Sequence, residues 1–267
     1  MLAALSPARR RFVLAMIAVA CAVAVLVAVV VARRAAGRPD PAAQNLPGPV
    51  LLVPGYGGST ASLDSLAALL RQRGRVATVV HLIGNGTGDL RAEAAVLATA
   101  ADHALGRTGA DSVDVIGYSA GGVVARLWVR DYGGDGLARR VVTLGSPQHG
   151  TDLAALAVDV LPGECPTACR QLAPDSDLLR ALNAGDETPD GPRFISIWTT
   201  SDHIVTPPES AHLDGAINIP VQTVCAGSSV SHGGLPTDPL VVAILSLEIG
   251  TAPPVVPTAA DCSRLSS

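Results

Sequence analysis

Short runs of branched apolar residues alternate with longer amphipathic segments between residues 50 and 249, and this alternation constrains the fold more than any other feature. The apolar runs predict strands at residues 50–53, 76–83, 113–116, 141–144, 194–198 and 221–224. The amphipathic segments predict helices from Ser59 or Thr60 to about 73, and at 89–105, 120–132 and 239–249. Strands that alternate with helices favour a mostly parallel sheet with helices on both faces. The sequence therefore predicts the α/β class.

The length of 267 residues suits one domain of this class. We expect an N-terminal segment at 1–36, a Pro/Gly-rich stalk at 37–49, the folded domain at 50–250 and a tail at 251–267. Residues 151–192 show the least regular pattern, and we expect them to form a cap or side excursion.

Residues 12–32 are continuously apolar and lie between arginine clusters at 9–11 and 33–34. About 20 such residues, at roughly 1.5 Å each, match the thickness of a bilayer core. We favour an uncleaved single-pass anchor with the N-terminus inside the cell, because the run is long for a cleaved signal. The alternatives are a cleaved export signal, since Arg9–Phe12 loosely fits a twin-arginine motif, and a lipoprotein signal at Cys21. Apolar residues after Cys21 argue against the last.

Four cysteines, Cys165, Cys169, Cys225 and Cys262, lie outside the apolar segment. An even number on an exported chain indicates two disulfides, with three possible connectivities. We favour Cys165–Cys169, which are close in sequence, and Cys225–Cys262, which would fasten the tail to the body. Four buried thiols are an alternative, and a zinc site is disfavoured because a second close pair is missing. This pattern places the domain outside the cell, anchored or secreted.

The charge distribution excludes nucleic acid as a partner. The net charge is −4, but six of the 19 basic residues lie within residues 1–39, which contain no acid. The rest of the chain therefore has 13 basic and 23 acidic residues, and a phosphate backbone would repel it.

The segment Gly117-Tyr118-Ser119-Ala120-Gly121 fits the pattern G-x-S-x-G between a predicted strand and a predicted helix. A sharp turn at this place raises the serine hydroxyl above the sheet, and the free N–H groups of the helix start can stabilise a developing oxyanion. The alternative is a glycine-rich turn with an ordinary serine. Ser119 is the predicted nucleophile.

Residues 49–58, residues 117–121 and residues 144–151 resemble the small secreted bacterial lipases and esterases, lipase class 2-like members of the α/β-hydrolase superfamily. The resemblance extends from about Pro49 to Leu247 and implies a minimal α/β-hydrolase fold. It implies that the backbone N–H groups of Tyr56 and Ala120 form the oxyanion hole. The family usually has His-Gly where this chain has Pro54-Gly55. A turn needed only for strand-to-helix geometry is the alternative for residues 54–58.

In α/β-hydrolases the acid and then the histidine follow the serine in the chain. Asp202 follows the predicted strand 194–198 and is the preferred acid, ahead of Asp214 and Glu209. His232, on a glycine-rich loop before the last helix, is the preferred base. The other histidines are less suitably placed in the predicted order: His81, His103, His149, His203 and His212. The resemblance gives His149 a structural role.

These assignments predict a carboxylic-ester hydrolase, a lipase or esterase that acts on lipid or other apolar esters through a Ser119–Asp202–His232 triad and an acyl-enzyme. Apolar residues that could line the site, or simply pack in the core, are Leu82, Ile83, Leu153, Leu156, Ile204 and Val205. A thioesterase, polyester hydrolase or acyltransferase would use the same triad. A silent surface-binding protein should have lost a triad member, and a structural membrane protein has only the apolar segment in its favour. We expect no cofactor, no metal and a monomer that meets the membrane through its N-terminal segment.

Overall fold

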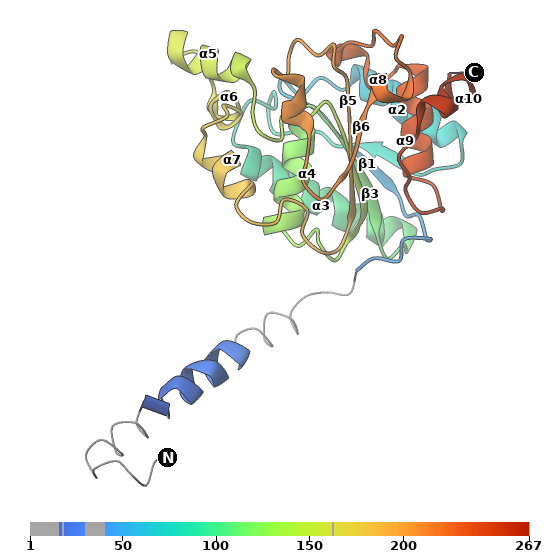
Figure 1. Cartoon of the computed structure of the whole chain (residues 1–267). Helices are drawn as coiled ribbons and strands as arrows, with labels where there is room; N and C mark the ends of the chain where they lie inside the picture. Colours follow the sequence, from blue (N-terminus) through green and yellow to red (C-terminus); the bar gives the residue numbers. More distant parts are fainter. Residues whose placement is uncertain (1–15, 18, 30–40, 162, 267) are drawn as a thin grey trace, which may run out of the picture. The chain divides into compact units, whose positions relative to one another are not determined.

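The structure is a computed structural model and describes residues 16–17, 19–29, 41–161 and 163–266 (Figure 1). The chain divides into two units, residues 1–40 and 41–267. In the first unit, residues 16–17 and 19–29 are helical. Within the described ranges, no helix has the length and apolar character needed to cross a membrane. The predicted apolar segment at 12–32 and the predicted stalk at 37–49 both extend beyond the described residues.

The second unit is built on a six-stranded sheet in which every neighbouring pair is parallel. The strand order is β2-β1-β3-β4-β5-β6. The strands are β1 (Val50–Val53), β2 (Ala77–Val79), β3 (Val113–Tyr118), β4 (Ala138–Leu144), β5 (Arg193–Trp198) and β6 (Ile217–Pro220). The predicted parallel α/β architecture is confirmed.

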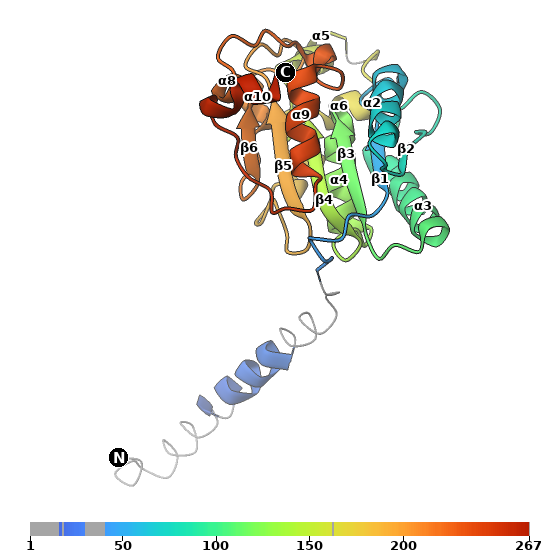
Figure 2. The same cartoon turned by 90° about the vertical axis from the view of Figure 1, so that its right-hand side faces the viewer.

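Helices cover both faces of this sheet because alternate strand residues point to opposite sides. Val50 and Leu52 of β1 pack in one apolar cluster with α2 (Ala61–Gln72) and α9 (Pro239–Glu248), which lie in front of the sheet in Figure 2. Leu51 and Val53 pack in the other cluster. That second cluster includes side chains of α3 (Leu90–Thr108), α4 (Ala120–Asp131) and α7 (Asp177–Leu182).

The prediction of a strand at residues 221–224 is wrong. These residues form the short helix α8 (Val221–Val224), and the strand lies just before it as β6. β6 pairs with β5 from Ile217 to Pro220, and Pro220 ends the strand and precedes the helix. Val221 and Val224 are both buried at a helical spacing, and so short an apolar run does not distinguish strand from helix.

Two other segments differ in detail from the prediction. The strand predicted at 76–83 is shorter, since β2 ends at Val79. The irregular segment 151–192 contains α5 (Asp152–Val160), α6 (Thr167–Gln171) and α7. Near the C-terminus, α10 (Cys262–Leu265) follows a short 3-10 helix, η4 (Ala259–Asp261).

The strand order reverses beside β1. From β1 the chain crosses to β2 on one side, and β3 then returns to pair with β1 on the other. In open parallel sheets, ligands bind beyond the carboxyl ends of the strands at such a switch point. The turn after β1 at residues 54–58 and Ser119 after β3 both lie at this place.

A buried ion-pair network lies at the amino ends of the central strands β3 and β4. The Asp114 carboxylate lies 2.6 Å from guanidinium nitrogens of both Arg139 and Arg75. Arg139 also donates to the carbonyl oxygens of Ile249 and Gly250, at 2.7 and 2.8 Å. The network therefore fixes the start of the C-terminal tail to the first residues of β3 and β4.

Candidate active site

Ser119 occupies a sharp turn between β3 and α4. Its backbone has φ 52° and ψ −126°, and it is the one non-glycine residue with a positive φ in the described part of the chain. Such a conformation costs about 1–3 kcal/mol and persists only where the surroundings enforce it. Gly121 contributes, because a Cβ at this position would lie 2.2 Å from the carbonyl oxygen of Val53. The helix therefore packs directly on β1 and holds the turn.

The structure brings Ser119, His232 and Asp202 together from three separate loops. Ser119 Oγ lies 3.1 Å from His232 Nε2, and His232 Nδ1 lies 2.7 Å from Asp202 Oδ2. Asp202 follows β5, and His232 begins the short 3-10 helix η3 (His232–Gly234). When Nδ1–H donates to Asp202, Nε2 is left as the acceptor for the serine hydroxyl.

Asp202 is buried and has hydrogen-bond donors at both oxygens. Its Oδ1 accepts the N–H groups of Ile204 and Val205, each at 2.9 Å. Burial by itself raises the pKa of this carboxyl, but the hydrogen bonds from His232 and from the Val205 N–H outweigh it, and the pKa is lowered. Asp202 is therefore a carboxylate at neutral pH, which lets it accept the imidazole N–H.

The loop that carries His232 is held by two contacts that sequence reasoning missed. Thr199 Oγ1 donates to the carbonyl oxygen of Val230 at 2.8 Å. Tyr118 OH donates to the carbonyl oxygen of His232 at 3.3 Å, and the two rings lie 5.2 Å apart. Burial and then the nearby Asp202 carboxylate raise the pKa of Tyr118 to about 12, so the phenol keeps its proton. The available signal was the place of Tyr118 directly before Ser119, the predicted nucleophile.

Gly145, directly after β4, is a second residue that sequence reasoning did not assign to the site. Its φ is +55°, and a Cβ there would lie 3.2 Å from both Asp202 Oδ2 and His232 Nδ1. The same atom would come within 2.5 Å of Leu235 Cδ1. A side chain at this position would therefore crowd both the acid and the histidine. The signal was its position in the lipase-like segment 144–151.

The two predicted oxyanion donors lie beside Ser119. The turn after β1 approaches closely, since a Cβ on Gly55 would be 2.8 Å from Cβ of Ser119. Tyr56, the next residue, lines the same cavity as Ser119. Ala120 is the first residue of α4, where a backbone N–H has no acceptor within the helix.

A mainly apolar cavity of about 430 Å³ opens beside Ser119. Its walls come from the turn after β1, from α5 and α6, and from the loop after β5. They include Tyr56, Leu153, Ala154, Ala157, Leu161, Cys165, Cys169, Leu172, Ile204 and Val205. Of the six apolar residues proposed from sequence, Leu153, Ile204 and Val205 line this cavity. Leu82, Ile83 and Leu156 are not among its lining residues.

Comparisons with known proteins agree with this architecture. The family model described as alpha/beta hydrolase fold matches residues 48–164. The chain has the α/β-hydrolase fold. Aspergillus fumigatus lipase B is similar in structure, with a TM-score of 0.70, 20% identity and coverage of 82% of this chain. The mature form of the Bacillus licheniformis lipase BlEst2 has a TM-score of 0.54 and 21% identity, with coverage of 68% of this chain and 84% of its own.

The chain spans only 56% of the length of the Aspergillus fumigatus lipase chain, so that protein's activity is not carried over directly. The propeptide form of BlEst2 has a TM-score of 0.62 and 19% identity, with coverage of 83% of this chain and 54% of its own. No curated protein matches the sequence. At such identities the solved structures establish the shared fold alone.

His232 pairs with Asp202 in this α/β-hydrolase domain, and not with either alternative acid. Asp214 is exposed and lies 3.6 Å from His212. Glu209 lies in the 3-10 helix η2 (Pro208–Ala211). His149 Nε2 lies 2.8 Å from Glu187 Oε1, a pairing that suits the structural role implied by the resemblance.

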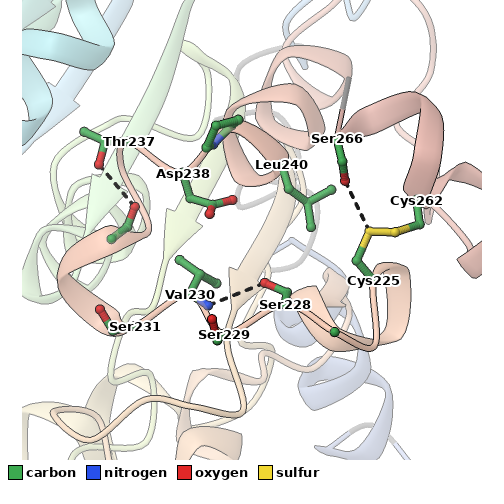
Figure 3. Close-up of a pocket in the computed structure, with 13 residues that line it drawn as sticks. Cys225, Ser228, Ser229, Val230, Ser231, Thr237, Asp238, Leu240, Cys262 and Ser266 are labelled. Carbon is green, nitrogen blue, oxygen red and sulfur yellow. Dashed lines mark hydrogen bonds between the residues drawn. A yellow bond between two sulfur atoms is a disulfide. The ribbon is translucent and has the colours of Figure 1, made fainter.

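Both disulfides expected from sequence are present, Cys165–Cys169 and Cys225–Cys262. The second borders another cavity, of about 800 Å³, which is lined in part by the residues just before His232 (Figure 3). Ser228 and Ser231, on either side of Val230, contribute to its wall, but His232 does not. The Cys165–Cys169 disulfide lines the cavity beside Ser119.

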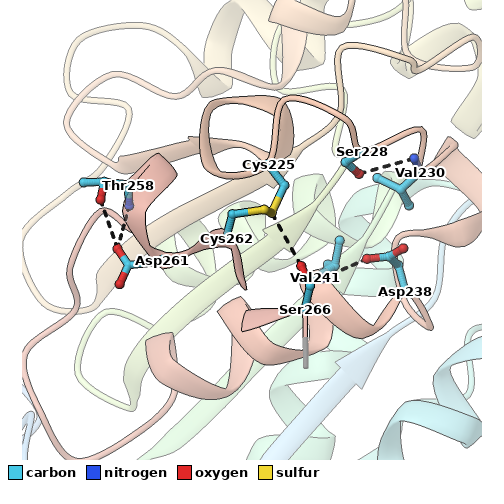
Figure 4. The surroundings of a disulfide bond; sticks show 9 residues. All are labelled: Cys225, Ser228, Val230, Asp238, Val241, Thr258, Asp261, Cys262 and Ser266. Atoms are coloured by element: carbon cyan, nitrogen blue, oxygen red, sulfur yellow. Dashed lines mark hydrogen bonds between the residues drawn. A yellow bond between two sulfur atoms is a disulfide. The ribbon is translucent and has the colours of Figure 1, made fainter. Parts of the chain in front are cut away.

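The Cys225–Cys262 disulfide joins the start of the His232 loop to the C-terminal tail (Figure 4). The tail is ordered locally at the same place, because Asp261 Oδ2 accepts the N–H of Thr258 at 2.9 Å. The loop is thus tied at one end to the tail and at the other to α9. Across the described residues, no group of three or more His, Cys, Asp or Glu side chains is arranged to hold a metal ion.

Proposed function

We propose that the protein is a serine carboxylic-ester hydrolase, a lipase or esterase, with Ser119 as nucleophile, His232 as general base and Asp202 as the orienting acid. The observation that carries this proposal is the continuous hydrogen-bonded series from Ser119 Oγ through His232 to Asp202. It lies at the carboxyl ends of the strands of an α/β-hydrolase fold, where such sites form.

The first step forms an acyl-enzyme. His232 Nε2 accepts the Ser119 proton while Oγ forms a bond to the ester carbonyl carbon, and the carbonyl oxygen becomes an oxyanion. The N–H groups of Tyr56 and Ala120 stabilise that oxyanion, each by about 3 kcal/mol in the transition state. The bond to the alcohol oxygen then breaks, and His232 donates its proton to the departing alcohol.

Hydrolysis of the acyl-enzyme repeats these transfers with water. His232 removes a proton from water as the water oxygen forms a bond to the acyl carbon. When the bond to Ser119 Oγ breaks, the serine regains a proton and the carboxylic acid leaves. Asp202 remains ionised throughout and stabilises the imidazolium that forms in each step.

The cavity beside Ser119 supports an apolar acyl group as the part of the substrate that is bound. Its volume of about 430 Å³ falls within the usual range for small-molecule sites. Its walls are largely aliphatic, so burial of methylene groups would contribute most of the binding free energy, at about 0.8 kcal/mol each.

A fluorophosphonate probe and p-nitrophenyl butyrate test the proposal with the full-length chain. We expect one covalent adduct, on Ser119, and ester hydrolysis that Ser119→Ala abolishes together with the adduct. Ser229→Ala, at an exposed serine of the other cavity, is the matched control and should retain both. Undiminished hydrolysis by Ser119→Ala would overturn the proposal.

A thioesterase or an acyltransferase would also be labelled by the fluorophosphonate probe. A thioesterase would prefer an acyl thioester, and an acyltransferase would transfer the acyl group to an added alcohol.

We further propose that the catalytic unit works outside the cytoplasm. Two disulfides in one domain are characteristic of exported proteins, because cytoplasmic thiols are kept reduced. Thiol labelling tests this directly, on protein that is isolated from its natural source and then denatured without a reductant. Cysteines 165, 169, 225 and 262 should react only after reduction.

A further inference from the structure

Two helices, α5 and α6, contribute walls of the cavity beside Ser119. They contact one another and lie at the upper left of Figure 1. Beyond α5, the N–H of Cys165 donates to the carbonyl oxygen of Leu161 at 3.2 Å, which folds the chain back toward α6. The Cys165–Cys169 disulfide then joins this turn to α6. The cavity is thus bounded by a helix on each side and by a covalently closed turn.

The base of α5 lies next to the proposed catalytic loops. The N–H of Asp152, at the first turn of α5, donates to the carbonyl oxygen of Thr206 at 2.8 Å, four residues beyond Asp202. Thr151 Oγ1 donates to the carbonyl oxygen of Ile204 at 2.7 Å. From Thr151, α5 leads away from Asp202 toward Leu161, so the closed turn is the end of the cavity farthest from the base of α5.

α6 forms a fixed wall, because its outer side is bonded to the body of the domain. Gln171 Nε2 donates to Asp89 Oδ1 at 2.7 Å, and Gln171 Oε1 accepts the N–H of Leu90 at 2.8 Å. The N–H of Ala168 donates to the carbonyl oxygen of Thr87 at 3.1 Å. These three bonds attach α6 to the start of α3.

The length of the cavity can be estimated from α5. Ala154, Ala157 and Leu161 line it from one side at a helical spacing. From Thr151 to Leu161 the helix advances by about 15 Å, at roughly 1.5 Å per residue. An extended chain advances about 1.2 Å per bond, as in an extended peptide, so roughly 12 bonds fit between the base of α5 and the closed turn.

We propose that Leu161 and the Cys165–Cys169 disulfide close an acyl-chain site and set the longest chain that Ser119 accepts. The preferred acyl group is then a straight chain of roughly 10 to 12 carbons, the length that fills the space between the base of α5 and the disulfide. This inference rests on the proposed ester hydrolysis and assigns a specificity-determining role to the disulfide.

A substitution within the cavity tests the position of the chain. In the full-length protein, kcat/KM is measured for p-nitrophenyl esters from butyrate to palmitate. We expect a maximum at decanoate or dodecanoate. Ala157→Phe should lower the decanoate-to-butyrate ratio of kcat/KM by about tenfold or more, because the ring occupies the path of the chain. Ala155→Phe, on the same helix but outside the cavity lining, is the matched control and should leave that ratio within twofold.

Removal of the disulfide tests the end wall. Cys165→Ser with Cys169→Ser should raise the palmitate-to-decanoate ratio of kcat/KM by about fivefold or more, since the turn can then open. Cys225→Ser with Cys262→Ser removes the other disulfide and should leave this ratio unchanged, even if the protein melts at a lower temperature.

The two proposals fail in different ways. If Ser119 reacts with fluorophosphonate and esters are hydrolysed, but both ratios match the wild type in Ala157→Phe and in the Cys165/Cys169 variant, the acyl-chain site is overturned and ester hydrolysis stands. If Ser119 does not react and no ester is hydrolysed, both are overturned.

Discussion

Asp202 and His232 are buried together with Oδ2 2.7 Å from Nδ1, and the second oxygen of Asp202 is occupied by the N–H groups of Ile204 and Val205. This arrangement leaves the carboxylate one orientation toward the ring. An acid bound in this way fixes which ring nitrogen carries the proton, and so makes Nε2 available to Ser119.

Asp202→Asn should therefore lower kcat by about 10³–10⁴-fold while the protein remains folded. The amide is neutral and can offer its NH₂ group to the ring, which favours the tautomer with the proton on Nε2. The measurement is kcat for a p-nitrophenyl ester, normalised to the fraction of folded protein. Asp214→Asn, at the exposed acid beside His212, is the control and should retain wild-type kcat. A loss of less than tenfold in Asp202→Asn would exclude Asp202 as the acid.

Gly145→Ala should lower kcat by about 10–100-fold, because the new Cβ would lie 3.2 Å from both Asp202 Oδ2 and His232 Nδ1 and would force them to shift. Gly133→Ala is a closely matched control. Its φ is also positive, at +75°, but no atom lies within 4 Å of the added Cβ. Both variants place a side chain at a positive φ, so both should lose some stability. Measuring kcat at a temperature where both are folded separates this loss of stability from the effect of the Cβ on Asp202 and His232. Equal kcat values would show that contact with the triad is unimportant.

The hydrogen-bonded series of Ser119, His232 and Asp202 could be predicted from sequence because the place of each residue depends on local chain order. Ser119 lies in a motif between a strand and a helix, and Asp202 and His232 each follow a predicted element in the order usual for the fold. The parallel sheet was equally predictable, since branched apolar runs alternate with amphipathic helices. The last strand was predicted four residues too late in the chain. The short apolar run at 221–224 is compatible with either a strand or a helix, and periodicity does not distinguish them.

Tyr118, Gly145 and the cavity wall at Cys165–Cys169 could not be assigned in the same way. Each acts through a contact between loops that are far apart in sequence: Tyr118 with His232, and Gly145 with Asp202. Neither the periodicity of the sequence nor a local motif indicates which distant loops come into contact. The disulfide pairing was predictable from spacing, but its place in the wall of the cavity depends on how α5 and α6 pack.

Glu248 makes stability depend on pH. It is fully buried at the end of α9, and burial raises its pKa to about 7, against smaller opposing effects of the Val255 N–H and Arg140. The folded state therefore holds this proton more tightly than the unfolded chain, whose glutamate has a pKa near 4.5. The free energy of unfolding should fall as pH rises from 4.5 through 7, by at most about 3 kcal/mol.

Glu248→Gln, which carries no ionisable group, should flatten this dependence. Urea unfolding at pH 5 and pH 8 measures the difference for the wild type and the variant. Glu209→Gln, at an exposed acid in η2, should retain the wild-type difference. If Glu248→Gln lost as much stability as the wild type between the two pH values, the pH dependence would have to arise from other groups.

Asp114→Asn should destabilise the fold without changing the chemistry at Ser119. The carboxylate is fully buried and lies 2.6 Å from both Arg139 and Arg75, so its removal leaves the buried Arg139 guanidinium without its anion. Breaking one partner of a buried ion pair costs about 3–5 kcal/mol. Because Asp114 lies at the amino end of β3 and Ser119 follows its carboxyl end, the fraction that remains folded should react with fluorophosphonate at the wild-type rate. Urea unfolding gives the loss of stability, and Asp111→Asn, at an exposed acid three residues earlier, is the control that should lose less than about 0.5 kcal/mol. A loss as small in Asp114→Asn would mean that the network contributes little to holding the C-terminal tail on the sheet.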